Sequence, residues 1–359
     1  MSRRLLTLLV VTLASALASH SSADEGEIAE TAAKVQSYLD SLAAEGKLSG
    51  VAAVAKNGHI IASKAAGIAN RATKEPITLE TKFNLGSMNK MFTAVAIAQL
   101  AQDGRLTFHD KVGQHLPDYP NKEVAENVTI HHLLTHTSGL ASYWGEEFNQ
   151  KRETLLTVAD HLPLIGKQGL SFTPGEKFQY SNSGFMLLGM IIEKITGQSY
   201  YDYVQRNVYE RAGMTGSGFY DPKQATPKLA IGYTKPQGGG EEIENTGMRE
   251  FRGGPAGGGY LTAADMLKFH VALRENKLLD AEHTRTVLIG KVDTGTPLGR
   301  YGYGFGDADR IIGHNGGAPG IAANFDMFPD NNYTAVTFMN RDRMMMPVVI
   351  KLRELIPSG

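Results

Sequence analysis

One tetrapeptide, Ser87-Met88-Asn89-Lys90, pairs a hydroxyl with an amine. Apolar residues recur at helical spacing from Met91 to Ala101, so the tetrapeptide lies where a loop becomes a helix. Residues three apart share a helix face, which brings Lys90 under the Ser87 hydroxyl. A lysine in an apolar setting can accept the proton that makes serine nucleophilic, and a helix start favours negative charge on an attacked carbonyl. The pattern alone occurs about once by chance in such a chain, and a capping serine beside a solvated lysine is the alternative.

A second group is Tyr180-Ser181-Asn182, which follows Pro174-Gly175 and precedes an apolar helix starting near Phe185. A tyrosine ionises at about pH 10, but a neighbouring ammonium favours its anion and makes it a candidate proton shuttle. The amide of Asn182 offers a donor and an acceptor to a substrate. An ordinary loop tyrosine is the alternative, because a similar pattern occurs at Tyr119-Pro120-Asn121.

A third group is His314-Asn315-Gly316-Gly317, which follows the strand-like residues 310–312. Glycines there would let a substrate approach the backbone closely. The backbone N–H of Gly317 could join that of Ser87 in an oxyanion hole. The alternative is a glycine-rich hairpin turn with an exposed histidine.

In their order along the chain, the three groups resemble the motifs of the serine β-lactamase, DD-peptidase and esterase superfamily, in its class C β-lactamase-like branch. The resemblance covers nearly the whole chain after the first residues. The stretches that support it are Phe83–Lys90, Ile130–Gly139, Phe172–Glu176, Gly213-Met214, Pro255–Leu261 and Tyr301–Phe305.

This resemblance implies an acyl-enzyme mechanism, with Ser87 as the nucleophile and proton transfer shared by Lys90 and Tyr180. It implies no metal or organic cofactor. The substrate-binding residues that it implies are Asn182, His314, Gly316 and Gly317. The expected partner is a small-molecule or peptide-like substrate, and the sequence leaves the oligomeric state open.

His314 departs from the lysine that many β-lactamases of this family place there. Histidine is charged only in part near neutral pH, which favours an esterase or a D-amino-acid peptidase. A β-lactamase or a D-alanyl-D-alanine carboxypeptidase is the alternative. A non-catalytic binding protein on the same fold is an alternative of another class.

Two other groups of residues have competing interpretations. His132 and His136 are four apart and could bind a metal from one helix face, but the glutamate typical of such pairs is missing, which favours a structural role. Tyr143, Trp144 and Phe148 form an aromatic group that either lines a substrate pocket or packs on the core.

Composition excludes several classes of protein. The 359 residues carry a formal net charge of -1, which argues against nucleic-acid binding. The absence of cysteine excludes thiol nucleophiles and cysteine-ligated metals. A basic start at 1–4 and an apolar run at 5–18 predict a signal peptide over 1–23, and hence a secreted or periplasmic protein without stable membrane insertion. The run is shorter than the roughly 20 residues that a spanning helix needs.

The remaining pattern predicts an α/β (α+β) fold, with an antiparallel sheet flanked by helices and a mostly helical second lobe. Two strands joined by Asn57-Gly58 form a hairpin over 50–66. Helices are expected at 27–45, 87–102, 185–195, 200–212, 263–274 and 347–355, and strands at 301–305, 310–312, 322–328 and 333–338. The residues of 235–259 are expected to form a loop. One domain over 24–359 would then consist of an α/β lobe (24–110 and 250–359) and a helical lobe (111–249), with a cleft between them.

Overall fold

The computed structural model describes residues 3–221, 224, 226–248, 252–297 and 299–358, with side chains from Asp24 on. The α-helices are α1 (Arg3–Ala44), α2 (Lys90–Gln102), α3 (Val112–His115), α4 (Lys122–Asn127), α5 (Ile130–Leu134), α6 (Glu146–Lys151), α7 (Leu162–Ile165), α8 (Asn182–Thr196), α9 (Tyr200–Val204), α10 (Ala263–Arg274), α11 (Ala281–Leu288) and α12 (Met345–Leu355). Short 3-10 turns include η1 (Gly86–Asn89) and η2 (Arg152–Thr154).

The main sheet is antiparallel, in the order β11-β12-β13-β14-β15-β16-β1-β2. Its strands are β1 (Gly50–Lys56), β2 (His59–Ala66), β11 (Val292–Asp293), β12 (Arg300–Tyr301), β13 (Gly306–Ala308), β14 (Ile311–Ala318), β15 (Ile321–Phe328) and β16 (Tyr333–Met339). Short paired strands outside it are β3 (Ile68–Asn70), β4 (Glu75–Pro76), β5 (Phe83–Asn84), β6 (Tyr233–Thr234), β7 (Ile243–Glu244), β8 (Gly253–Gly254), β9 (Gly257–Gly258) and β10 (Tyr260–Leu261).

Strands from the two ends of the chain share this sheet, as predicted. β1 pairs with β16 from Gly50↔Met339 to Lys56↔Tyr333. The β1–β2 hairpin is confirmed, and both of its turn residues have a positive φ (Asn57 +53°, Gly58 +83°), which the Asn-Gly pair tolerates well. The fold class is therefore the predicted one.

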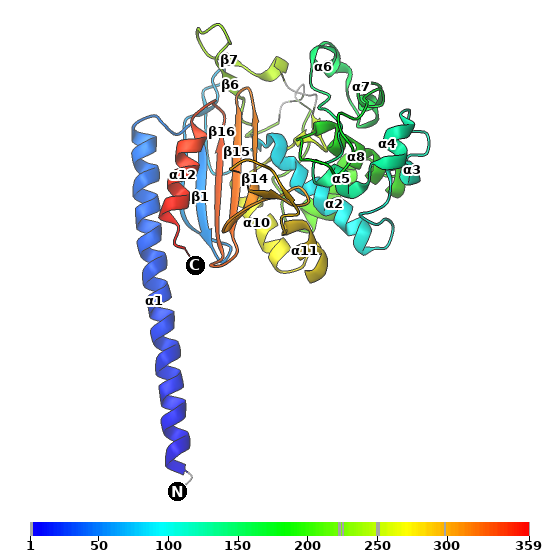
Figure 1. Cartoon of the computed structure of the whole chain (residues 1–359). Coiled ribbons are helices and arrows are strands. Elements are labelled where there is room, and N and C mark those ends of the chain that lie inside the picture. The colour runs from blue at the N-terminus through cyan, green and yellow to red at the C-terminus, as the bar shows by residue number, and fades with distance from the viewer. Residues whose placement is uncertain (1–2, 222–223, 225, 249–251, 298, 359) are drawn as a thin grey trace.

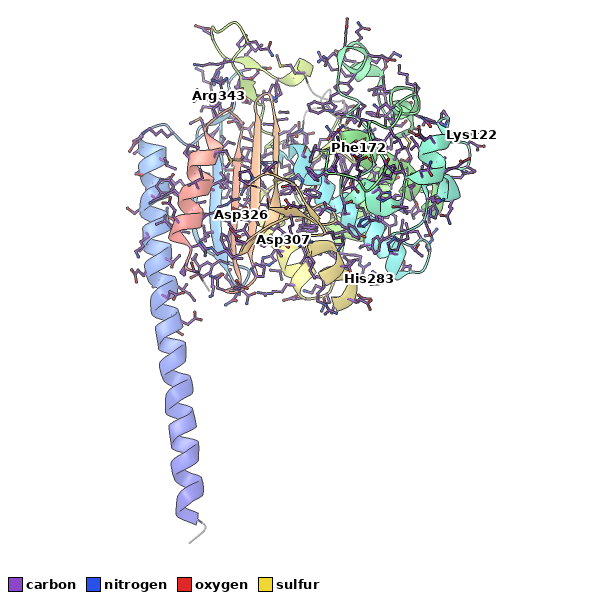
Figure 2. All side chains as sticks on the ribbon, in the orientation of Figure 1. Lys122, Phe172, His283, Asp307, Asp326 and Arg343 are labelled. Atoms are coloured by element: carbon purple, nitrogen blue, oxygen red, sulfur yellow. The ribbon has the colours of Figure 1, made fainter. Side chains whose placement is uncertain are left out.

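Helices cover both faces of the sheet (Figure 1). α1 and α12 pack on one face through a buried apolar cluster that includes Val35, Leu39 and Val349. Asp326 on β15, labelled in Figure 2, accepts two hydrogen bonds from Arg353 on α12 (2.7 and 2.8 Å). These hydrogen bonds hold α12 on the sheet. A second buried apolar cluster covers the opposite face of the sheet. It continues through α10 and α2 into the helical region, so the sheet and these helices share one core.

Several predicted boundaries were wrong. The strand expected at 301–305 is only the short β12, and the strand expected at 310–312 continues to Ala318 as β14. The helix expected at 200–212 is α9 followed by a π-helical stretch, Gln205–Glu210. The region 235–259 includes β7, β8 and β9 besides loop. The helix at 263–274 is confirmed as α10.

At the N-terminus, α1 is one continuous helix over Arg3–Ala44 rather than a helix beginning near residue 27. The predicted signal segment, 1–23, lies outside the residues whose side chains are described. Within the described part of the chain, no helix combines the length and the apolar character needed to cross a bilayer.

Candidate active site

Ser87 lies in the turn η1, and α2 begins three residues later at Lys90. The buried side chain of Asn89 fixes the position of this turn. Its buried side-chain amide donates to the Tyr200 hydroxyl (3.0 Å) and to the Gly254 carbonyl (2.7 Å). Since the turn is held by a buried polar network, the Ser87 side chain has a defined position. Sequence reasoning missed the role of Asn89, because its partners come from distant segments.

Lys90 is fully buried and reaches three acceptors. Its ammonium donates to Ser87 Oγ (3.2 Å), to Asn182 Oδ1 (2.8 Å) and to the Ala256 carbonyl. Asn182 is in turn held by a hydrogen bond from its Nδ2 to Ser142 Oγ (3.1 Å). The predicted Ser87–Lys90 contact is therefore present.

Tyr180 completes this cluster, just before the first turn of α8. Its hydroxyl interacts with the Ser87 side chain, and the Lys90 ammonium lies 4.8 Å from the centre of its ring. About a third of the residue is exposed (37%), but the environment of the hydroxyl is buried, and this burial raises the pKa of Tyr180. Ser87 thus has a lysine at hydrogen-bond distance and a tyrosine that interacts with its side chain.

His136 helps to position Tyr180. The two rings pack with their centres 4.1 Å apart, and the Ser181 N–H donates to His136 Nδ1 (3.1 Å). The Gln179 N–H donates to the His136 carbonyl (2.8 Å), so both residues that flank Tyr180 are held. α5 ends at Leu134 and His136 has a φ of +58°, so His132 and His136 do not share a helix face. The sequence indicated a structural role for this pair, but not the contact with Tyr180.

His314 lies across from Tyr180, with the two ring centres 6.5 Å apart. The Tyr301 hydroxyl lies 2.9 Å from its Nε2, and its Nδ1 contacts the Asn315 carbonyl. A carbonyl only accepts, so Nδ1 carries the proton and Nε2 accepts from Tyr301. Burial, with a smaller contribution from the Lys90 charge, lowers the pKa of His314 to about 3. The imidazole is therefore neutral at ordinary pH, not partly charged.

The His314–Gly317 motif is part of β14 and does not form the hairpin turn that was the alternative. Beyond Gly313, β14 pairs only with β15, so its other edge faces the site in the described structure. A Cβ on Gly316 would lie 1.8 Å from the Leu85 carbonyl oxygen and 3.0 Å from the Ser87 nitrogen. Gly316 is therefore required for the strand to approach the Ser87 turn, whereas a Cβ on Gly317 would have room.

Two cavities border the cluster. The first, the Ser87 cavity, has a volume of about 330 Å³ and is lined by Ser87, Asn182 and Gly317 together with the predicted aromatic group. The second, the Tyr180 cavity, has a volume of about 390 Å³ and is lined by Tyr180, His314 and Tyr301. The aromatic group thus borders a pocket, and Tyr143 and Phe148 also belong to the buried core, so both of its interpretations hold. Ser87 thus lines the first cavity, and Tyr180 lines the second.

Three histidines, of which His136 and His270 are buried and His314 is partly buried, predict a loss of stability in acid. Burial lowers the pKa of His314 to about 3, that of His270 to about 4, and that of His136 well below its ordinary value. Below pH about 6.5 the unfolded chain protonates these groups and the folded chain does not, so the free energy of unfolding falls as the pH falls. Each histidine contributes a decrease on the order of 1–2 kcal/mol between pH 6.5 and 5.

Urea unfolding at pH 7, 6 and 5 measures this decrease. His270→Gln should reduce the slope, since it removes one of the groups. A free energy of unfolding that stays constant over this range would contradict the assignment of neutral histidines.

Comparisons with known proteins show the family to which this chain belongs. The family model described as Beta-lactamase matches residues 34–355. A penicillin-binding protein of Bacillus subtilis (strain 168) is 29% identical, with 90% of this chain and 76% of the relative covered. Esterase EstB of Burkholderia gladioli is 31% identical, with 80% of this chain and 81% of the relative covered. The crystal structure of a penicillin-binding protein from Bacillus halodurans is 33% identical and superposes with a TM-score of 0.81, over 89% of this chain and 100% of that one. The chain therefore belongs to the Beta-lactamase family and is a serine hydrolase.

Proposed function

We propose that this protein is an exported hydrolase that forms an acyl-enzyme on Ser87 from an ester or a D-amino-acid amide. The observation that carries the proposal is the pair of contacts on the Ser87 hydroxyl, from Lys90 at 3.2 Å and from Tyr180. A nucleophile that contacts groups able to take its proton is the arrangement that covalent catalysis uses.

In this mechanism, Lys90 first gives up one proton to solvent and becomes a neutral amine, which keeps its N–H donors to Asn182 and Ala256. Its lone pair then accepts the Ser87 proton as Ser87 Oγ attacks the substrate carbonyl, and Tyr180 passes a proton on to the leaving group while it regains one from Lys90. The bond from the carbonyl carbon to the leaving oxygen or nitrogen then breaks, and the leaving group takes that proton. Water releases the acyl group by the same steps. The N–H groups of Ser87 and Gly317 stabilise the oxyanion, and Asn182 holds Lys90 in place.

The neutral state of His314 supports an ester or an amide over a β-lactam. A β-lactamase or a D-alanyl-D-alanine carboxypeptidase would benefit from a fixed positive charge near the substrate carboxylate. His314 supplies none at neutral pH, because its Nε2 accepts from Tyr301 and its pKa is lowered to about 3.

Mass spectrometry of the intact protein and of its peptides tests the proposal. The protein is incubated separately with an activated ester, a labelled penicillin and a D-alanyl-D-alanine peptide. We expect an acyl adduct on the peptide that contains Ser87, with the ester as the best reagent. Folded protein without an adduct from any of the three reagents would favour a non-catalytic binding protein.

The two tyrosine motifs allow an internal comparison. Tyr180→Phe removes the hydroxyl that contacts Ser87 and is expected to lower kcat by about 100-fold, a common size for a lost proton-transfer group. Tyr119→Phe removes a buried hydrogen bond to the Ile165 carbonyl (3.2 Å), and should cost about 1 kcal/mol of stability with little change in kcat. Steady-state kinetics and urea unfolding of both variants measure this. The reverse pattern would show that Tyr119 is the functional tyrosine.

Export is proposed from the basic start at 1–4 and the apolar run at 5–18. The N-terminal sequence of the mature protein, recovered from the medium or the periplasm, tests it. A protein that retains Met1 would contradict cleavage.

A further inference from the structure

Aromatic side chains and one positively charged side chain lie next to one another in the lining of the Ser87 cavity. Trp144 and Phe148 stack with parallel rings, 5.8 Å between centres. Arg152 comes four residues after Phe148, where α6 passes into η2, so the two side chains share a face. All three line the same cavity as Ser87. Among the described residues that line it, Arg152 alone carries a formal charge.

The carboxylates near Arg152 in sequence do not neutralise it. Both oxygens of Glu147 are engaged, one by Lys151 (2.9 Å) and the other by Lys167. Glu153 is adjacent in sequence, and adjacent residues do not face one another on a helical turn. Within the described part of the chain, no carboxylate forms an ion pair with Arg152. A half-buried guanidinium that no carboxylate of the described residues pairs with is a binding group for an anion.

The proposed mechanism fixes which part of the substrate meets these side chains of the Ser87 cavity. Tyr180 lines the other cavity, so a leaving group that takes its proton from Tyr180 departs on that side. The acyl group that stays on Ser87 then occupies the Ser87 cavity. Its volume of about 330 Å³ is within the range of small-ligand pockets.

The geometry points to a substrate whose acyl group has an apolar body and an anionic end, with the body against Trp144 and Phe148 and the anion on Arg152. This specificity rests on the acyl-enzyme mechanism proposed above. It assigns Arg152 as a specificity-determining residue that contacts the part of the substrate remote from the reacting carbonyl.

Two isosteric esters test this inference: the mono-4-nitrophenyl ester of suberic acid, with a free carboxylate, and the 4-nitrophenyl ester of suberamic acid, with a neutral amide in its place. We expect kcat/KM to favour the carboxylate ester about tenfold or more, as a charge-assisted contact does. The preference should decrease at high salt, because Arg152 is partly exposed. Because kcat/KM for both esters is measured with the same variant, a general loss of activity leaves the ratio of the two kcat/KM values unchanged.

Arg152→Gln should remove the preference, and Arg152→Lys should keep part of it. Lys151→Gln is the matched control, because it removes the same charge one residue earlier, outside the cavity lining, and should leave the ratio unchanged. Equal turnover of the two esters by the unmodified protein, or a preference that survives Arg152→Gln, overturns the inference. Turnover of both esters that persists in Ser87→Ala, or the absence of any adduct, overturns the acyl-enzyme proposal and this inference with it.

Discussion

Ser87→Ala is expected to lower kcat/KM for an activated ester by about 10⁴-fold or more, and to abolish the acyl adduct. Losses of this size follow when the nucleophile of a serine hydrolase is removed, because the remaining groups then have no covalent step to assist. The substitution removes one oxygen atom from a turn that Asn89 holds independently, so the fold should be retained.

The assay compares Ser87→Ala with Ser37→Ala, which changes an exposed serine on α1, far along the chain from the site. The control should retain the activity of the unmodified protein. Thermal unfolding of both variants separates a lost nucleophile from a lost fold. Activity of folded Ser87→Ala above the level of a mock preparation would refute the assignment of Ser87.

Elements that are specified by local sequence could be predicted closely. The β1–β2 hairpin depends on the turn geometry of Asn57-Gly58. α10 begins at Ala263, and the side chain of the preceding Thr262 caps it by accepting from the Asp265 N–H (3.1 Å). Both signals lie within a few residues, so the sequence alone contains them. The Ser87–Lys90 contact is local in the same sense, since both residues belong to one turn and the start of its helix.

Features that arise from tertiary packing could not be predicted this way. Glycine pairs are typical of turns, yet Gly316 lies inside β14 because the Leu85 carbonyl leaves no space for a Cβ. The spacing of His132 and His136 suggests one helix face, but the helix ends between them and His136 packs on Tyr180. In both cases the decisive neighbour lies in a distant segment of the chain.

The second large effect is expected when Lys90 is substituted. Two substitutions at this position distinguish the contribution of its positive charge from its contribution to proton transfer. Lys90→Met keeps the length of the side chain but removes the ammonium from the Ser87 hydroxyl. We expect kcat/KM to decrease by about 10³-fold or more, because Ser87 loses a proton-transfer partner. Lys194→Met, at an exposed position on α8, is the matched control and should have little effect.

The stability of Lys90→Met should change by only about 1–2 kcal/mol, which urea unfolding measures. Removing a fully buried charge saves its desolvation cost, while the Asn182 and Ala256 oxygens lose a donor, and these two effects oppose each other. A large loss of stability would instead make Lys90 chiefly a structural residue.

Lys90→Arg then distinguishes the two ways in which Lys90 could assist Ser87. An arginine preserves the positive charge, but its guanidinium does not give up a proton in proteins. If Lys90 takes part in proton transfer, this variant should be nearly as inactive as Lys90→Met in the same ester assay. If Lys90→Arg retained most of the activity, the charge alone would suffice, and Tyr180 would have to carry the proton by itself. The kcat/KM of this one variant therefore decides whether the Ser87 proton passes through Lys90.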